Sequence, residues 1–60
     1  MDSENLTTYE IEQVLKAKIE YHRNLFRNFE KNQLKLEAAM QQILTKEIQD
    51  IARQLLGYYL

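Results

Sequence analysis

The chain has 60 residues and a formal net charge of −1, with one glycine, one histidine and neither proline nor cysteine. A chain this short buries only about 60% of the surface that its unfolded form exposes, so it has room for one core, without disulfides or a histidine-rich zinc site to stabilise it. The near-neutral charge also gives no overall field that would attract nucleic acid or an anionic membrane.

Residues 1–6 precede the first predicted helix, and we expect them to form a flexible lead-in. The stretch from Met1 to Asn5 is acidic and polar. It lacks the basic start and apolar run of a secretion signal, and no apolar run in the sequence approaches the ~20 residues that span a bilayer. Together with the lack of cysteine, which suits a reducing compartment, this predicts a cytoplasmic protein without a membrane role.

A helix is predicted to begin at residue 7. Thr7 and Glu10 form the T-x-x-E pattern of a capping box, in which each side chain accepts a hydrogen bond from the other residue's backbone amide. Leu6 and Ile11 occupy the positions of a hydrophobic staple across the same helix end. Two independent patterns therefore indicate the same starting point.

Apolar residues then recur at spacings of three and four, the pattern of an apolar stripe on a helix. The first set comprises Ile11, Val14, Leu15, Ile19, Leu25, Phe26 and Phe29. The second set comprises Leu36, Met40, Ile43, Leu44, Ile48, Ile51 and Leu55. Gly57 follows at the position where a glycine commonly ends a helix.

The segment between the two sets decides between a hairpin and one long helix. It contains neither glycine nor proline, but Asn28 can end one helix and Asn32 can begin another. The stripe also loses a turn here, and a single helix of about 50 residues would be exceptional in a globular chain. We therefore expect an all-α antiparallel hairpin, a single domain over residues 7–60 with helices at 7–28 and 33–56 and a turn at 28–32. The alternative is one continuous helix in a coiled coil.

Both stripes are wide, which suits a bundle better than a two-helix seam. A lone hairpin would leave much of each stripe exposed to water, so we expect the chain to associate with itself into a four-helix bundle and to bind a larger protein. The residues predicted for the core and the partner interface are Ile19, His22, Phe26, Phe29, Leu36, Met40, Ile43 and Ile51.

The end of the sequence is unusually apolar. Tyr58, Tyr59 and Leu60 follow Gly57 directly. Large apolar side chains at an exposed end either fold back on their own helix or serve as a docking patch for a partner. Both interpretations remain open from the sequence.

His22 lies on the first stripe, and no second histidine or cysteine stands at a metal-ligand spacing from it. A packed histidine is the simplest interpretation. A sharper hypothesis is a pH-responsive contact at the interface, because imidazole changes charge near neutral pH.

Basic residues recur every four positions at Arg23, Arg27, Lys31 and Lys35. Such a row can contact phosphates or an acidic partner, although a solvated helix face is the simpler interpretation. A turn at residues 28–32 would divide this row between two helices.

The sequence offers little for catalysis. It has no cysteine, its one serine lies in the lead-in, and it contains no glycine-rich phosphate loop. We therefore predict a protein that is not an enzyme and that uses no cofactor, metal or small-molecule substrate. The predicted function is a small protein–protein interaction module, such as an adaptor, a co-chaperone or a regulatory inhibitor. The alternatives are a nucleic-acid-binding regulator that uses Arg23, Arg27 and Lys31, or a purely structural oligomerisation module.

Overall fold

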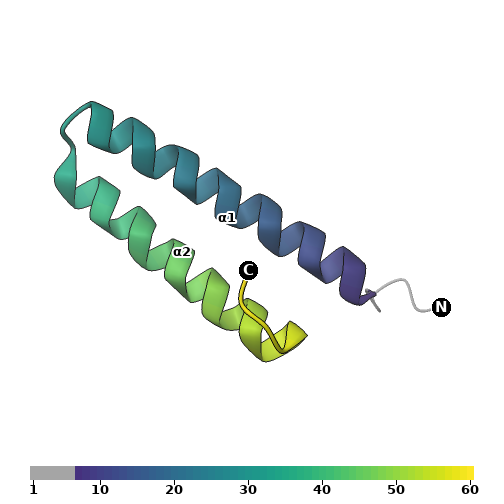
Figure 1. Ribbon diagram of the computed structural model, residues 1–60. Coiled ribbons are helices and arrows are strands. Elements are labelled where there is room, and N and C mark those ends of the chain that lie inside the picture. Colours follow the sequence, from purple (N-terminus) through teal and green to yellow (C-terminus); the bar gives the residue numbers. More distant parts are fainter. Residues whose placement is uncertain (1–6) are drawn as a thin grey trace.

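The fold is an antiparallel hairpin of two helices, seen in a computed structural model that describes residues 7–60. Helix α1 spans Thr8–Lys31 and helix α2 spans Lys35–Leu56. Figure 1 shows the two helices side by side along most of their length, joined by a short turn. The predicted all-α hairpin is confirmed, and the alternative of one continuous helix is wrong.

Helix α1 begins with the predicted capping box. The Glu10 amide donates to the Thr7 hydroxyl oxygen at 3.1 Å, and the Thr7 amide donates to Glu10 Oε1 at 2.9 Å. These bonds satisfy two backbone donors that a helix start otherwise leaves without partners. The other half of the expected staple, Leu6, lies outside the described residues.

The turn falls three residues later than the sequence indicated. Helix α1 continues past Asn28 to Lys31, and Gln33 adopts the left-handed conformation with φ of 62°. The amide of Leu34 donates to Phe29 O at 2.8 Å and the amide of Gln33 to Glu30 O at 3.0 Å, which is the bond pair of a Schellman motif. The motif ends α1 without a glycine, and it places the left-handed residue at Gln33 instead of at an asparagine.

Replacing Gln33 with glycine is expected to stabilise the hairpin by about 1 kcal/mol, because a side chain in the left-handed region costs about 1–2 kcal/mol that glycine avoids. Chemical denaturation followed by circular dichroism measures the change. Gln13→Gly, inside α1, is the matched control and should destabilise by about 1 kcal/mol. A Gln33→Gly chain that is less stable than wild type would contradict this assignment of the turn.

The seam between the helices is narrow and contains small side chains on one side. The residues that are more than nine-tenths buried are Leu15 and Ile19 of α1 and Ala38 and Ala52 of α2. His22 Nδ1 lies 2.6 Å from Gln41 Oε1 across the seam and fixes the register of the two helices. Large residues of α1 therefore pack on a small-residue side of α2.

This packing does not bring the two apolar stripes face to face. The stripe of α2 turns away from α1, and Leu36, Met40, Ile43 and Ile51 are all exposed, so none of them belongs to the seam of the hairpin. Their place in a partner interface stays a prediction. Alanines at the seam let the two helix backbones approach closely. Helix α1 therefore packs against α2 although the apolar stripe of α2 turns away from it.

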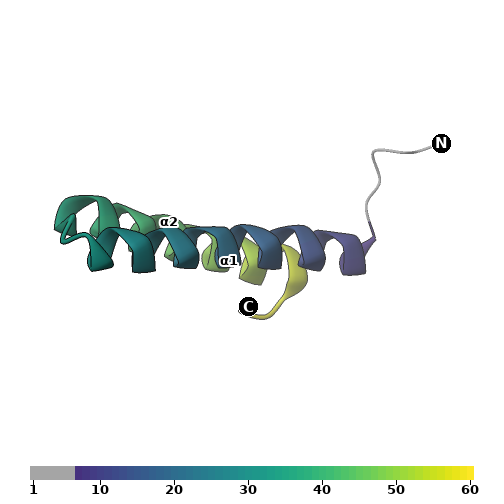
Figure 2. The same cartoon turned by 90° about the horizontal axis from the view of Figure 1, so that it is seen from above.

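The end of α2 is the predicted glycine cap. Gly57 has φ of 88° and its amide donates to Arg53 O at 2.9 Å. The chain reverses there, and residues 58–60 fold back against the helices (Figure 1). Figure 2 shows that this tail lies on one side of the layer formed by α1 and α2. Neither helix is long and apolar enough to cross a membrane.

Candidate functional site

The hairpin is one helix thick and so has two broad faces (Figure 2). In a helix each residue is turned by about 100° from the one before it. A residue that directly precedes an inward-facing one therefore points to one broad face, and a residue that directly follows points to the other. Because α1 and α2 are antiparallel, the preceding residues of both helices point to the same face.

The face formed by the preceding residues is apolar. Val14 precedes Leu15, Leu44 precedes Thr45, and Ile51 precedes Ala52, and each of these three is 37–48% exposed. We call this surface the apolar face; its exposed large residues are Val14, Tyr21, Met40, Leu44, Ile51 and Leu55. Several large apolar side chains exposed on one face are characteristic of a surface that binds another molecule.

The face formed by the following residues is polar. Arg23, Gln42, Lys46 and Gln49 lie on it, and the tail folds against it. The two faces of the hairpin therefore differ sharply, and the tail covers the polar one.

The structure divides the predicted interface residues into four groups. Ile19, His22, Phe26 and Phe29 of α1 are buried or half-buried and turned toward α2. Met40 and Ile51 lie on the apolar face, whereas Leu36 and Ile43 lie on the outer edge of α2. The last group is the tail, Tyr58, Tyr59 and Leu60, on the polar side. Val14, Leu44 and Leu55 belong to the predicted stripes but were not expected at the interface, and Tyr21 was not predicted at all. Ala38 and Ala52 are the signal that Leu44 and Leu55 face away from the seam.

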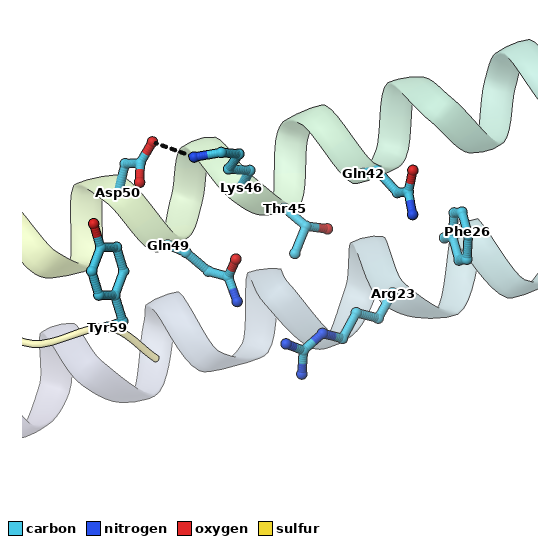
Figure 3. A pocket seen from close by; sticks show the side chains of 8 residues that line it. All are labelled: Arg23, Phe26, Gln42, Thr45, Lys46, Gln49, Asp50 and Tyr59. Atoms are coloured by element: carbon cyan, nitrogen blue, oxygen red, sulfur yellow. Dashed lines mark ion pairs between the residues drawn. The ribbon is translucent and has the colours of Figure 1, made fainter.

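A groove of about 540 Å³ runs along the polar face between the helices and the tail. Figure 3 shows its lining: Arg23 and Phe26 come from α1, the tail contributes Tyr59, and the remaining side chains come from α2. Lys46 and Asp50 form an exposed ion pair of 3.7 Å at its rim. The groove is open to solvent along its length and its charges are mixed, so it offers no enclosed reaction site.

Three polar contacts hold the tail. The Tyr58 hydroxyl donates to Glu12 Oε1 at 2.5 Å, and Gln49 Nε2 donates to the Leu60 carbonyl at 3.0 Å. The Arg53 guanidinium lies 5.6 Å from the centre of the Tyr59 ring, within the range of a cation–π contact. Of the two interpretations left open by the sequence, the structure shows the tail folded back on its own helices.

The Tyr58–Glu12 contact makes the tail sensitive to pH at both extremes. The hydrogen bond from Tyr58, aided by Lys16, lowers the pKa of Glu12 below its usual 4.5, and the bond to Glu12 raises the pKa of Tyr58 above its usual 10.0. The contribution of Glu12 is present above pH 4.5 and is lost as the pH falls through its lowered pKa. The contribution of Tyr58 is present below pH 10.0 and is lost as the pH rises through its raised pKa.

Replacing Glu12 with glutamine is expected to move the pKa of Tyr58 back toward 10.0, because the carboxylate that opposes deprotonation is gone. A pH titration of the Tyr58 ring resonances by NMR measures this. Glu20→Gln, an exposed change on the same helix, is the control and should leave the Tyr58 titration as in wild type. An unchanged Tyr58 titration in Glu12→Gln would contradict the docked tail.

His22 lies at the seam and not on the apolar face. Its Nδ1 lies 2.6 Å from Gln41 Oε1, and because an amide oxygen only accepts, Nδ1 is the donor of this hydrogen bond. A pH-responsive partner contact at His22 stays a prediction.

The basic row is divided between the two helices, as expected, but the break lies between Lys31 and Lys35. Because α1 extends to Lys31, Arg23, Arg27 and Lys31 stay on successive turns of it. Glu20 and Glu30 lie among them on the same helix, and the Arg27 guanidinium donates to Asn24 Oδ1 at 2.7 Å. The surface is thus of mixed charge.

Among residues 7–60, the structure brings no three histidine, aspartate or glutamate side chains together in a way that could hold a metal ion. Comparisons with protein-family models, curated proteins and solved structures found no match for this chain. The apolar face is therefore the candidate functional site on its geometry alone.

Proposed function

We propose that the chain is a non-enzymatic protein–protein interaction module that acts through the apolar face. The observation that carries this proposal is the exposure of six large apolar side chains on one side of a hairpin whose other side carries charged and amide side chains and the docked tail. A partner that covers this face removes apolar surface from water without disturbing the seam between the helices.

The energetics favour such a partner. Complete burial of one large apolar side chain contributes about 1.5–3 kcal/mol, so covering six that are roughly half exposed contributes about 5–9 kcal/mol before entropic costs. The core of a chain below about 70 residues rarely supplies more than about 3–5 kcal/mol. The uncovered face therefore holds as much potential stabilisation as the seam itself.

The titratable groups support a binding role over catalysis. Shifted pKa values in the described part of the chain belong to Glu10, Glu12 and Tyr58, and the capping box and the docked tail account for all three. Perturbed groups in an enzyme gather in a cleft where chemistry uses them. Here they hold backbone and tail in place.

Site-specific photo-crosslinking in cells that produce the chain tests the proposal. A photoreactive phenylalanine derivative placed at position 14 or 44, on the apolar face, is expected to give protein adducts. The same group at position 42 or 46, on the polar face, is the matched control and should give few. Adducts formed equally from both faces, or from the polar face alone, would contradict the proposal.

A further inference from the structure

The apolar face carries few charges for its length, which suits a self-complementary surface. A twofold interface brings two identical patches together, so a patch with a strong net charge would repel its own copy. By the same helix geometry, the charged residues that directly precede inward-facing ones are Lys18, before Ile19, and the glutamates Glu10, Glu37 and Glu47, before Ile11, Ala38 and Ile48. One cation and three anions leave the face with a net charge of −2, spread over both helices.

The size of the face also matches a second hairpin. Helix α2 has 22 residues, a length of about 33 Å, and two packed helices are about 20 Å wide. One face therefore offers about 650 Å² per chain, or about 1,300 Å² for two, which lies within the range of stable protein interfaces.

The contrast between the two faces limits the assembly to a closed pair. The polar face carries charged and amide side chains, among them Arg23, Gln42, Lys46 and Gln49, and the docked tail. Stacking an apolar face on another apolar face leaves these charged and amide side chains outside, where they do not complement the apolar face of a third hairpin. Two stacked hairpins form a four-helix bundle in which neighbouring helices are antiparallel.

The surroundings of the face favour protein over lipid as its occupant. Helices that lie on membranes carry lysine and arginine on their polar side. On this hairpin Glu12 and Asp50 alternate with Lys16 and Lys46 and form ion pairs with them. That side would gain little attraction from anionic headgroups.

We propose that the partner at the apolar face is a second copy of this chain, joined through a twofold axis into a four-helix bundle with a core formed by Val14, Leu44 and Ile51 of both copies. This assignment rests on the proposed function, since it names the occupant of the same face. In this bundle, the apolar layer between the two copies adds to the seam within each copy.

Sedimentation analysis of wild type, Leu44→Glu and Gln42→Glu tests the assignment. Wild type is expected at twice the chain mass of 7.2 kDa. Leu44→Glu places a charge on the apolar face and should shift the protein to the single-chain mass or unfold it. Gln42→Glu, the same charge two residues away on the polar face, should leave the dimer intact. A wild type of single-chain mass, or a Leu44→Glu dimer as tight as wild type, would overturn the proposal.

A second measurement does not depend on the folding of Leu44→Glu. The chain has no cysteine, so Val14→Cys and Gln42→Cys each provide one reactive thiol, on the apolar and the polar face. At high protein concentration the thiol at position 14 should be alkylated about tenfold more slowly than after dilution, because the second copy covers it. The thiol at position 42 should show no such difference. Equal rates at position 14 at both concentrations would overturn the proposal.

The photo-crosslinks distinguish this proposal from the broader function. An adduct at twice 7.2 kDa from position 14 or 44 supports a second copy. An adduct of any other mass from these positions keeps the interaction module and overturns self-association as its basis. The lack of any adduct from the apolar face overturns both.

Discussion

Replacing Ile19 with alanine is expected to lower the free energy of unfolding by about 2–4 kcal/mol, because Ile19 is 4% exposed and alanine leaves a cavity at the seam. A core of this size supplies about 3–5 kcal/mol in total. Most molecules should therefore lose their helical signal at room temperature at low protein concentration. Circular dichroism combined with urea denaturation measures both effects.

The matched control for this change is Ile43→Ala. Ile43 is 59% exposed and lies on the outer edge of α2, so its truncation should cost about 0.5 kcal/mol or less. Both variants remove the same atoms from a helix. Equal losses of stability in the two variants would show that the seam does not lie where α1 and α2 place it.

Replacing Ala52 with leucine is expected to destabilise the hairpin by about 1–3 kcal/mol, because an overfilled seam forces the helices apart. Ala52 is completely buried and lies where α2 approaches α1. Leucine is more apolar than alanine and has a similar helix propensity, so no loss of stability would be expected if this position were open. Thermal and urea unfolding curves measure the change.

Ala17→Leu provides the control, since Ala17 is an exposed position in the middle of α1. Its stability should stay within about 0.5 kcal/mol of wild type. If Ala52→Leu were as stable as Ala17→Leu, the close approach of α2 through its alanines would be wrong, and the stripe of α2 would instead face α1.

The start of α1 and the end of α2 were predictable because local patterns encode them. The capping box of Thr7 and Glu10 and the glycine cap at Gly57 formed as expected. The turn was harder to locate, because the Schellman motif places Gln33 in a conformation that glycine or asparagine usually adopts. No local preference marked that residue.

The orientation of α2 was not predictable from its apolar periodicity. Periodicity says which residues share a side of a helix, but not whether a neighbouring helix of the same chain covers that side. The small residues Ala38 and Ala52 decided the packing, and the larger Leu44 and Ile51 were left on the apolar face. The expectation of unsatisfied apolar surface was sound, whereas the residues that form the seam had to come from the structure.

Unfolding measured over a thousandfold range of protein concentration tests most directly whether the apolar face is covered by another molecule of the chain. If two copies cover it, each tenfold dilution lowers the apparent stability by about 1.4 kcal/mol, and helicity falls as the mass drops from twice 7.2 kDa to the single chain. A fully helical single chain of 7.2 kDa whose unfolding midpoint is the same at every concentration would contradict the account.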